Sequence, residues 1–311
     1  MKKIGIWAIR TLLLGTFLVL TVYVFDWRLM LEQGNTLLMH PGWLVWMSGM
    51  YLGAFALRAW AWRVYLQRRV SYMNCLYGLF YSLFLNHILP IKAGDAVRIG
   101  YIAKRDAIAW GEAAHSVVVL RLLDMLVLGG MTAAGILALG LSLSTLFFWL
   151  VLAGVAIAGS FIYIVLRTKK HSFWKKHLYL LRNGFAGLDG ILVVSATLAS
   201  WLLEAWIVVG VLRTLRMDLP FLSGVWVNSM TIAGQVFHFT PGGIGTYESV
   251  MSFSLATLGI DWRQAYLISL LSHGFKFAFS YVIGIWTLAF APLSFREIRS
   301  WIQGKNKKHN D

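Results

Sequence analysis

The chain has 311 residues, of which 59% are hydrophobic and 13% are charged, and its formal net charge is +15. An ordinary soluble domain carries about 25% charged residues, and here the hydrophobic residues fall into several long runs. A run of about 20 apolar residues spans the hydrocarbon layer of a bilayer. The composition therefore excludes a soluble enzyme, a secreted domain and a disordered chain, and it predicts a polytopic helical membrane protein of the all-α class.

The positive charge is placed as membrane topology requires. Lys and Arg lie at the ends of the apolar runs and in one connecting stretch, residues 167–182. This pattern is typical of a basic cytoplasmic face, which attracts anionic lipid headgroups, so we expect no nucleic-acid partner. The single cysteine, Cys75, excludes an internal disulfide and has no neighbouring ligand for a metal.

The predicted full spans, in chain order, are residues 6–25, 42–66, 113–139, 145–166, 188–211 and 262–290. The N-terminal Met1-Lys2-Lys3 and the first run resemble a signal peptide. No small-x-small cleavage site follows that run, so it is predicted to remain as the first span.

Two further apolar regions are interrupted. Residues 72–89 stop at Pro90, and residues 220–238 run into a Pro/Gly segment at 241–245 before another apolar run at 246–258. Because proline lacks an amide hydrogen and glycine destabilises helices, both places are predicted helix breaks.

The positive-inside rule favours two re-entrant hairpins over two additional spans. If residues 72–89 crossed the bilayer, the basic stretch 167–182 would face outside. We therefore predict a single integral membrane domain, residues 1–311, with about six full spans. The hairpin 72–105 would enter from the cytoplasmic side and the hairpin 220–258 from the outer side, with both termini cytoplasmic. Such an inverted-repeat arrangement is typical of transporters; the alternative is that the breaks are loops between short helices.

Several charges lie inside predicted spans, where each costs about 2.5–3.5 kcal/mol on insertion scales. Arg121 and Asp124 share a helix face, so they form either a self-neutralising structural pair or part of a functional site. Glu204 and Lys276 have no opposite charge one turn away. Glu204 needs a partner from another helix, a proton or a polar cavity, and Lys276 is a similar case.

The two breaks carry candidate binding groups. Asp95 and Arg98 follow the first break, and Glu248 follows the second. Helix ends attract anions through their unpaired amides, and the glycines at the second break would let a headgroup approach the backbone. The candidate binding residues at the second break are therefore Pro241, Gly242, Gly243 and Gly245.

Metal and nucleophilic chemistry have no support in the sequence. His87, His238 and His273 lack the paired spacing of metal ligands, so each is either a packing residue or a proton-coupling group. No GxSxG motif occurs. We expect no catalytic residue, no metal and no cofactor.

Three motifs follow one another along the chain: Pro90-x-x-Ala93-Gly94-Asp95-x-x-Arg98, then Val118-Val119-Leu120-Arg121-Leu122-Leu123-Asp124, then Pro241-Gly242-Gly243-Ile244-Gly245-x-x-Glu248. This ordered set resembles the lysylphosphatidylglycerol synthase transmembrane-region family of flippase-like membrane proteins. The chain departs from the pattern at Leu120, where the family often has Glu, and at Ala93. The resemblance implies a stand-alone member without the aminoacyl-transferase domain, in the cytoplasmic (inner) membrane of a prokaryote.

The resemblance and the charges together predict a lipid translocase rather than an enzyme. Its substrate would be an anionic or aminoacylated phospholipid, or a polyprenyl-phosphate-linked lipid, crossing through a polar cavity between the hairpins. Arg98, Arg121 and Lys276 would hold the phosphate, and the balancing carboxylates would be Asp95, Asp124, Glu204 and Glu248. The alternatives are an accessory subunit of a glycosyltransferase or lipid-modifying synthase, and a membrane-embedded enzyme with Asp95 or Glu248 as general base. The sequence leaves the oligomeric state open.

Overall fold

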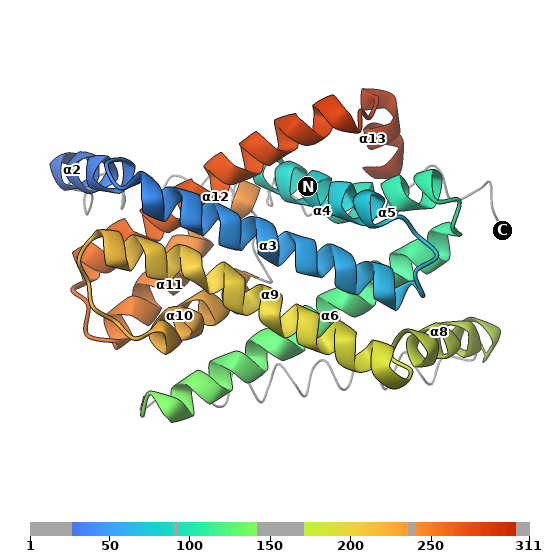
Figure 1. Cartoon of the computed structure of the whole chain (residues 1–311), viewed down its shortest axis with the longest axis horizontal. Coiled ribbons are helices and arrows are strands. Elements are labelled where there is room, and N and C mark those ends of the chain that lie inside the picture. Colours follow the sequence, from blue (N-terminus) through green and yellow to red (C-terminus); the bar gives the residue numbers. More distant parts are fainter. Residues whose placement is uncertain (1–26, 90–92, 142–170, 236–239, 303–311) are drawn as a thin grey trace, which may run out of the picture.

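The computed structural model describes residues 27–89, 93–141, 171–235 and 240–302 (Figure 1). All regular secondary structure within these ranges is helical, which confirms the all-α prediction. The predicted spans 6–25 and 145–166 lie outside the described residues, as do His238 and the C-terminal tail. The count of six spans and the cytoplasmic position of both termini therefore stay predictions.

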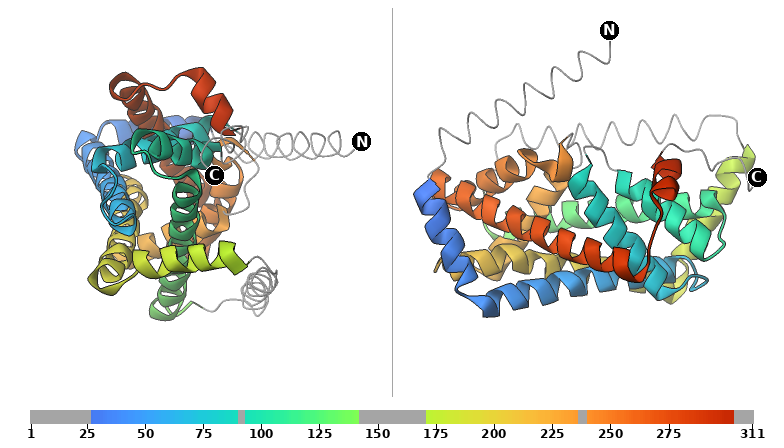
Figure 2. Two further views of the ribbon diagram at one scale, coloured as in Figure 1. Left: turned by 90° about the vertical axis from the view of Figure 1, so that its right-hand side faces the viewer. Right: turned by 90° about the horizontal axis from the view of Figure 1, so that it is seen from above.

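Four long helices coincide with predicted spans: α3 (Pro41–Tyr65), α6 (Trp110–Ala138), α9 (Gly187–Thr214) and α12 (Trp262–Phe290). Among the described helices, α6, α9 and α12 are long and apolar enough to cross a membrane. A helix of 29 residues, such as α6, is about 40 Å long. Helix α3 packs along α9, and α3 and α12 both run lengthwise through the molecule (Figure 2).

Shorter helices lie at the two ends of this bundle (Figure 1). Helix α2 (Trp27–Leu38) lies at one end, and α8 (His171–Gly184) and α13 (Phe295–Ile302) lie at the other. Arg68 pairs with Asp189 at 2.8 Å and Lys104 pairs with Glu297 at the α8/α13 end. The hydrogen bond from Lys104, together with bonds from Ser294, lowers the pKa of Glu297 to about 2.

Both predicted helix breaks are present, and each separates two helices that pack against each other. Helix α4 (Tyr72–Ile88) is followed by α5 (Ala93–Arg105). Helix α10 (Phe221–Gly234) and α11 (Thr246–Thr257) flank a 3₁₀ turn, η2 (Pro241–Gly243), in which Gly242 has φ +62°. We call these pairs the first hairpin (α4–α5) and the second hairpin (α10–α11).

The open ends of the two hairpins lie at opposite ends of the bundle. At the open end of the first hairpin, Asp106 accepts hydrogen bonds from the Ser71 amide and from Asn74, and these bonds connect the start of α4 to the end of α5. Helix α13 packs beside α5. The second begins just after the C-terminal end of α9 and leads into the start of α12. Between them the tips meet, because α4 contacts η2. How the hairpins are oriented relative to a bilayer stays a prediction.

Close contact within the first hairpin depends on Gly94. Its amide donates to the Asn86 side-chain oxygen at 2.9 Å, which satisfies a helix-start N–H of α5 that has no partner within its own helix. A Cβ atom at this position would lie 2.3 Å from the Ser82 carbonyl oxygen. Only glycine therefore lets α5 approach α4 this closely.

We expect Gly94→Ala to separate α5 from α4 and to lower the free energy of unfolding by about 1–3 kcal/mol, the usual cost of overpacking. The measurement is thermal unfolding of the detergent-purified protein. Gly129→Ala in α6 is the matched control, because nothing lies within 4 Å of its added methyl. This control should be neutral or stabilising by up to about 1 kcal/mol, and equal melting of the two variants would contradict the close-contact interpretation.

Candidate functional site

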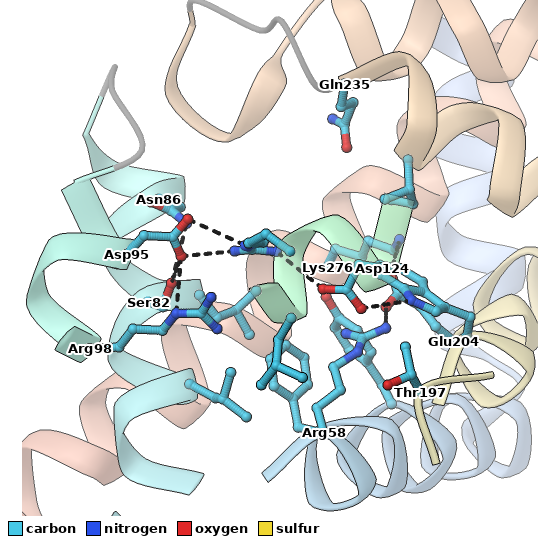
Figure 3. Close-up of a pocket in the computed structure, with 18 of the residues that line it drawn as sticks. Arg58, Ser82, Asn86, Asp95, Arg98, Asp124, Thr197, Glu204, Gln235 and Lys276 are labelled. Carbon is cyan, nitrogen blue, oxygen red and sulfur yellow. Dashed lines mark hydrogen bonds and ion pairs between the residues drawn. The ribbon is translucent and has the colours of Figure 1, made fainter. Parts of the chain in front are cut away.

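A cavity of about 480 Å³ lies in the middle of the bundle, where the two hairpin tips meet the long helices (Figure 3). Side chains from α3, α4, α5, α6, α9, α10, α11 and α12, together with Gly242 of η2, line it. Among the described residues, its charged lining consists of four cations and three carboxylates: Arg58, Arg98, Arg121, Lys276, Asp95, Asp124 and Glu204. Such a concentration of charge among apolar helices is typical of a functional site.

Asp95 organises the side of the cavity formed by the first hairpin. It follows the break closely, in the first turn of α5. Its carboxylate accepts hydrogen bonds from the Arg121 guanidinium, at 2.9 and 3.3 Å, and from the Ser82 hydroxyl at 3.0 Å. Asp95 thereby joins α4, α5 and α6, and it brings the first motif, at the start of α5, into contact with the second motif, on α6.

Arg98 lies one turn after Asp95 and is 5% exposed. Its Nε is 3.2 Å from an Asp95 oxygen, but the contact lacks hydrogen-bond geometry, and Nε and Nη2 have no hydrogen-bond partner among the described residues. The guanidinium also faces the Trp62 ring at 5.4 Å. Buried guanidinium donors are expensive to leave unpaired, so the cavity presents a cation that an anionic ligand would satisfy.

Glu204 organises the opposite side of the cavity. One carboxylate oxygen accepts from Arg58 at 2.6 Å, and the other accepts from Lys276 at 2.7 Å. Arg58 also stacks on the Trp201 ring at 3.9 Å and donates to Ser200. The Glu204 carboxylate thus connects α3, α9 and α12. Glu204 and Lys276 are each other's partner, and Arg58 is a second partner for Glu204.

Asp124 lies between these two groups. Its carboxylate accepts from the Trp201 indole N–H at 3.0 Å, and it approaches Arg121 only to 4.0 Å. The expected helix-face pair of Arg121 and Asp124 is therefore weak, because Asp95 on another helix holds Arg121 at shorter distance. The two residues belong to a network across helices rather than to a self-neutralising pair.

Glu248, at the second hairpin, has a different environment from the other predicted carboxylates. It is buried, and one oxygen accepts from the Gly245 amide at 2.7 Å, which caps the start of α11. The other oxygen lies 2.6 Å from His273 Nδ1. Glu248 does not line the cavity, whereas His273 does.

The structure thus brings most of the predicted site residues to one cavity. Asp95, Arg98, Arg121, Asp124, Glu204, Gly242 and Lys276 line it. The glycines Gly243 and Gly245 shape the turn behind it, each with positive φ, and the side chain of Pro241 lies outside the described atoms.

Sequence reasoning missed Arg58, a cation in the interior of α3. The signal was available, because Arg58 is an isolated charge in an apolar run, as Glu204 is. Ser82, Asn86 and Asn228 were also missed; Asn228 accepts from Lys276 at 3.5 Å. Single polar residues of this kind are common in helices, so only their spatial convergence distinguishes them. Within the described ranges, no group of three or more His, Cys, Asp or Glu side chains is arranged to hold a metal ion.

Fold and site together define a polytopic helical membrane protein with a charged cavity at the meeting point of two broken hairpins. Residues 7–284 match the lysylphosphatidylglycerol synthase transmembrane region, and the chain belongs to that family. It is also similar to the UPF0104 membrane protein MJ1078 of Methanocaldococcus jannaschii, with 22% identity over 61% of this chain and 86% of the relative. No solved structure matches the chain.

We expect Glu204→Gln to destabilise the protein strongly, since it leaves Arg58 and Lys276 buried without their shared anion. Removing one partner of a buried ion pair costs about 3–5 kcal/mol, and thermal unfolding in detergent measures it. The control is Asp218→Asn, just after α9, where the pair with Arg213 is exposed and the cost should stay below about 1 kcal/mol. Similar losses in both variants would show that Glu204 does not join the three helices energetically.

Proposed function

We propose that the protein is a lipid translocase that moves a phosphate-containing headgroup between the two leaflets through the charged cavity. The acyl chains stay in the hydrocarbon layer while the headgroup crosses inside the cavity, so the charged headgroup is not exposed to the hydrocarbon. Arg98 carries the proposal: its guanidinium is buried at the cavity wall with two donor nitrogens lacking hydrogen-bond partners among the described residues.

The charge balance of the cavity supports an anionic substrate. In the described part of the chain, four cations of the lining face three carboxylates, and this leaves one positive charge to be neutralised. Arginine binds phosphate oxygens through a planar set of donors. The cavity, at about 480 Å³, is within the range of ligand sites, about 300–1,000 Å³.

The carboxylates extend the range of headgroups that the site accepts. Asp124 and Glu204 lie on the other side of the cavity from Asp95 and Arg98 (Figure 3), and they would contact the amine of an aminoacylated phospholipid. We propose three classes of candidate substrate: anionic phospholipids, aminoacylated phospholipids and polyprenyl-phosphate-linked lipids. All three contain a phosphate group.

The two hairpins supply the break points that alternating access requires. Gly242 at the tip of the second hairpin contacts the end of α4 in the first, and both border the cavity. In transporters, broken helices at corresponding positions of two repeats surround the substrate. The match of an archaeal membrane protein supports a location in a prokaryotic cytoplasmic membrane.

The first test is a fluorescent-lipid flipping assay in proteoliposomes with Arg98→Gln. The substitution removes the cation but leaves Asp95 paired with Arg121, so the protein should remain folded. Because hydrogen bonds to charged groups are worth about 1.5–3 kcal/mol, the apparent affinity for an anionic headgroup should fall about 10- to 100-fold. Arg105→Gln, on the same helix but exposed, is the control and should flip lipid as the unaltered protein does.

Two outcomes of this assay would contradict the proposal. Absence of flipping for every lipid, from protein shown to be folded, would favour an accessory subunit of a glycosyltransferase or synthase. Chemical conversion of a labelled lipid by purified protein in detergent would favour a membrane-embedded enzyme, because a translocase leaves its substrate unchanged.

A further inference from the structure

His273 of α12 is placed between two hydrogen-bond acceptors. Its Nδ1 lies 2.6 Å from a Glu248 carboxylate oxygen, and its Nε2 lies 3.1 Å from the Gly242 carbonyl oxygen. His273 and Glu248 are each 3% exposed. A backbone carbonyl can only accept a hydrogen bond, so Nε2 must carry a hydrogen to make this contact favourable.

The hydrogen bonds of the pair require one bound proton. If His273 is neutral with its hydrogen on Nε2, then Nδ1 is an acceptor, and Glu248 must be protonated to donate to it. If Glu248 is ionised, His273 must carry hydrogens on both nitrogens. The two descriptions differ only in where the proton lies, and in both the pair is neutral overall.

Losing that proton would break the hydrogen bond between His273 and the Gly242 carbonyl at the tip of the second hairpin. The neutral imidazole would keep its single hydrogen on Nδ1, where the ionised Glu248 holds it through a charge-assisted bond. Its Nε2 lone pair would then face the Gly242 carbonyl lone pairs at the tip. From the described residues, that carbonyl would retain a hydrogen bond from Gln235 at 3.5 Å, which is long and therefore weak.

We propose that His273 and Glu248 form a proton-binding site that holds the second hairpin tip against α12, and that translocation of an anionic headgroup is coupled to this proton. The coupling rests on the proposed translocase function, whereas the proton site rests on the geometry alone.

The surroundings of the pair connect it to the cavity. His273 and His87 both line the cavity, and their rings lie 6.4 Å apart. Tyr247 stacks on His273 at 4.1 Å, and Lys276 follows one turn later on α12. Among the described residues of the packed elements, the titratable groups near the pair are Tyr51 and Arg58 of α3, His87 of α4, Glu204 of α9, Tyr247 of α11, and Lys276 of α12.

Electrostatics gives the sign of the coupling. Without the proton, the pair carries one negative charge beside the cavity, which disfavours an anionic headgroup. With the proton the pair is neutral, and the cavity keeps its excess cation. Binding of proton and anion must therefore favour each other, and thermodynamic linkage makes the effect reciprocal. The proton and the headgroup would move in the same direction.

The proton site is tested by labelling a cysteine at the hairpin tip. In a Cys75→Ala background, which removes the only native cysteine, Thr246→Cys places a thiol at the first turn of α11. Its rate of reaction with N-ethylmaleimide is measured against pH. When the pair loses its proton, the tip loses one hydrogen bond, and the labelling rate should rise about 2- to 10-fold. This rise comes in addition to the one caused by ionisation of the thiol itself.

Glu248→Gln is the variant that separates the proton from the structure. The oxygen of the introduced amide would accept from the Gly245 amide, and its NH₂ group would donate to His273 Nδ1. A neutral His273 would then keep its Nε2 hydrogen bond to Gly242 without any extra proton. In this variant the hairpin tip should stay against α12 at every pH, and the labelling rate should change with pH only through ionisation of the thiol. Identical labelling profiles in the two backgrounds would overturn the proton site.

The coupling is tested separately, by flipping of an anionic fluorescent lipid under an imposed pH gradient. The unaltered protein should flip faster when the lipid and the proton gradient point the same way, and Glu248→Gln should be insensitive to the gradient. Flipping that ignores the gradient in both proteins would overturn the coupling. Absence of flipping in any condition would instead overturn the proposed function, while the labelling result would still decide the proton site.

Discussion

The charges that this chain buries among its helices have to be compensated by one another. A single carboxylate, Glu204, accepts from Arg58 on α3 and from Lys276 on α12, and a second, Asp95, accepts from Arg121 on α6. The two Glu204 contacts join helices that are distant in sequence, whereas the Asp95 contact joins the consecutive helices α5 and α6. Because a buried charge without a partner is strongly destabilising, these two carboxylates determine which helices surround the cavity, and the apolar packing follows around them.

Arg98 has a charge partner in Asp95, but its hydrogen bonding is incomplete. Arg98 is more deeply buried than Asp95 and Arg121, yet Nε and Nη2 have no hydrogen-bond partner among the described residues. A structural network would be expected to satisfy its own donors. The unsatisfied guanidinium, the excess of one cation and the two hairpin tips all occur at the same cavity, and together they favour a site that exchanges its internal pairs for those of a passing anionic headgroup.

Much of this architecture could be predicted from the sequence, for physical reasons. Long apolar runs predicted α3, α6, α9 and α12, and Pro90 and the Pro241–Gly243 turn predicted the two helix breaks. The isolated charge at Glu204 correctly demanded a partner from another helix. The identity of that partner could not be predicted, since Arg58 lies 146 residues away. The spacing of Arg121 and Asp124 along the helix predicted a closer ion pair than the structure has. Helix periodicity cannot show that Asp95, on another helix, lies closer to Arg121 than Asp124 does. Likewise, Glu248 was predicted among the cavity carboxylates, whereas its oxygens are occupied by the Gly245 amide and His273.

Selection of a phosphate-containing headgroup by the cavity is the property on which the proposed function depends. The most direct measurement compares two fluorescent lipids with identical acyl chains in the same proteoliposomes, one with an anionic phosphate headgroup and one with an uncharged sugar headgroup. We expect the protein to accelerate flipping of the phosphate lipid and to leave the uncharged lipid at the rate of protein-free vesicles. Equal acceleration of both lipids would contradict this selection, because a charged cavity would then play no part in determining what crosses.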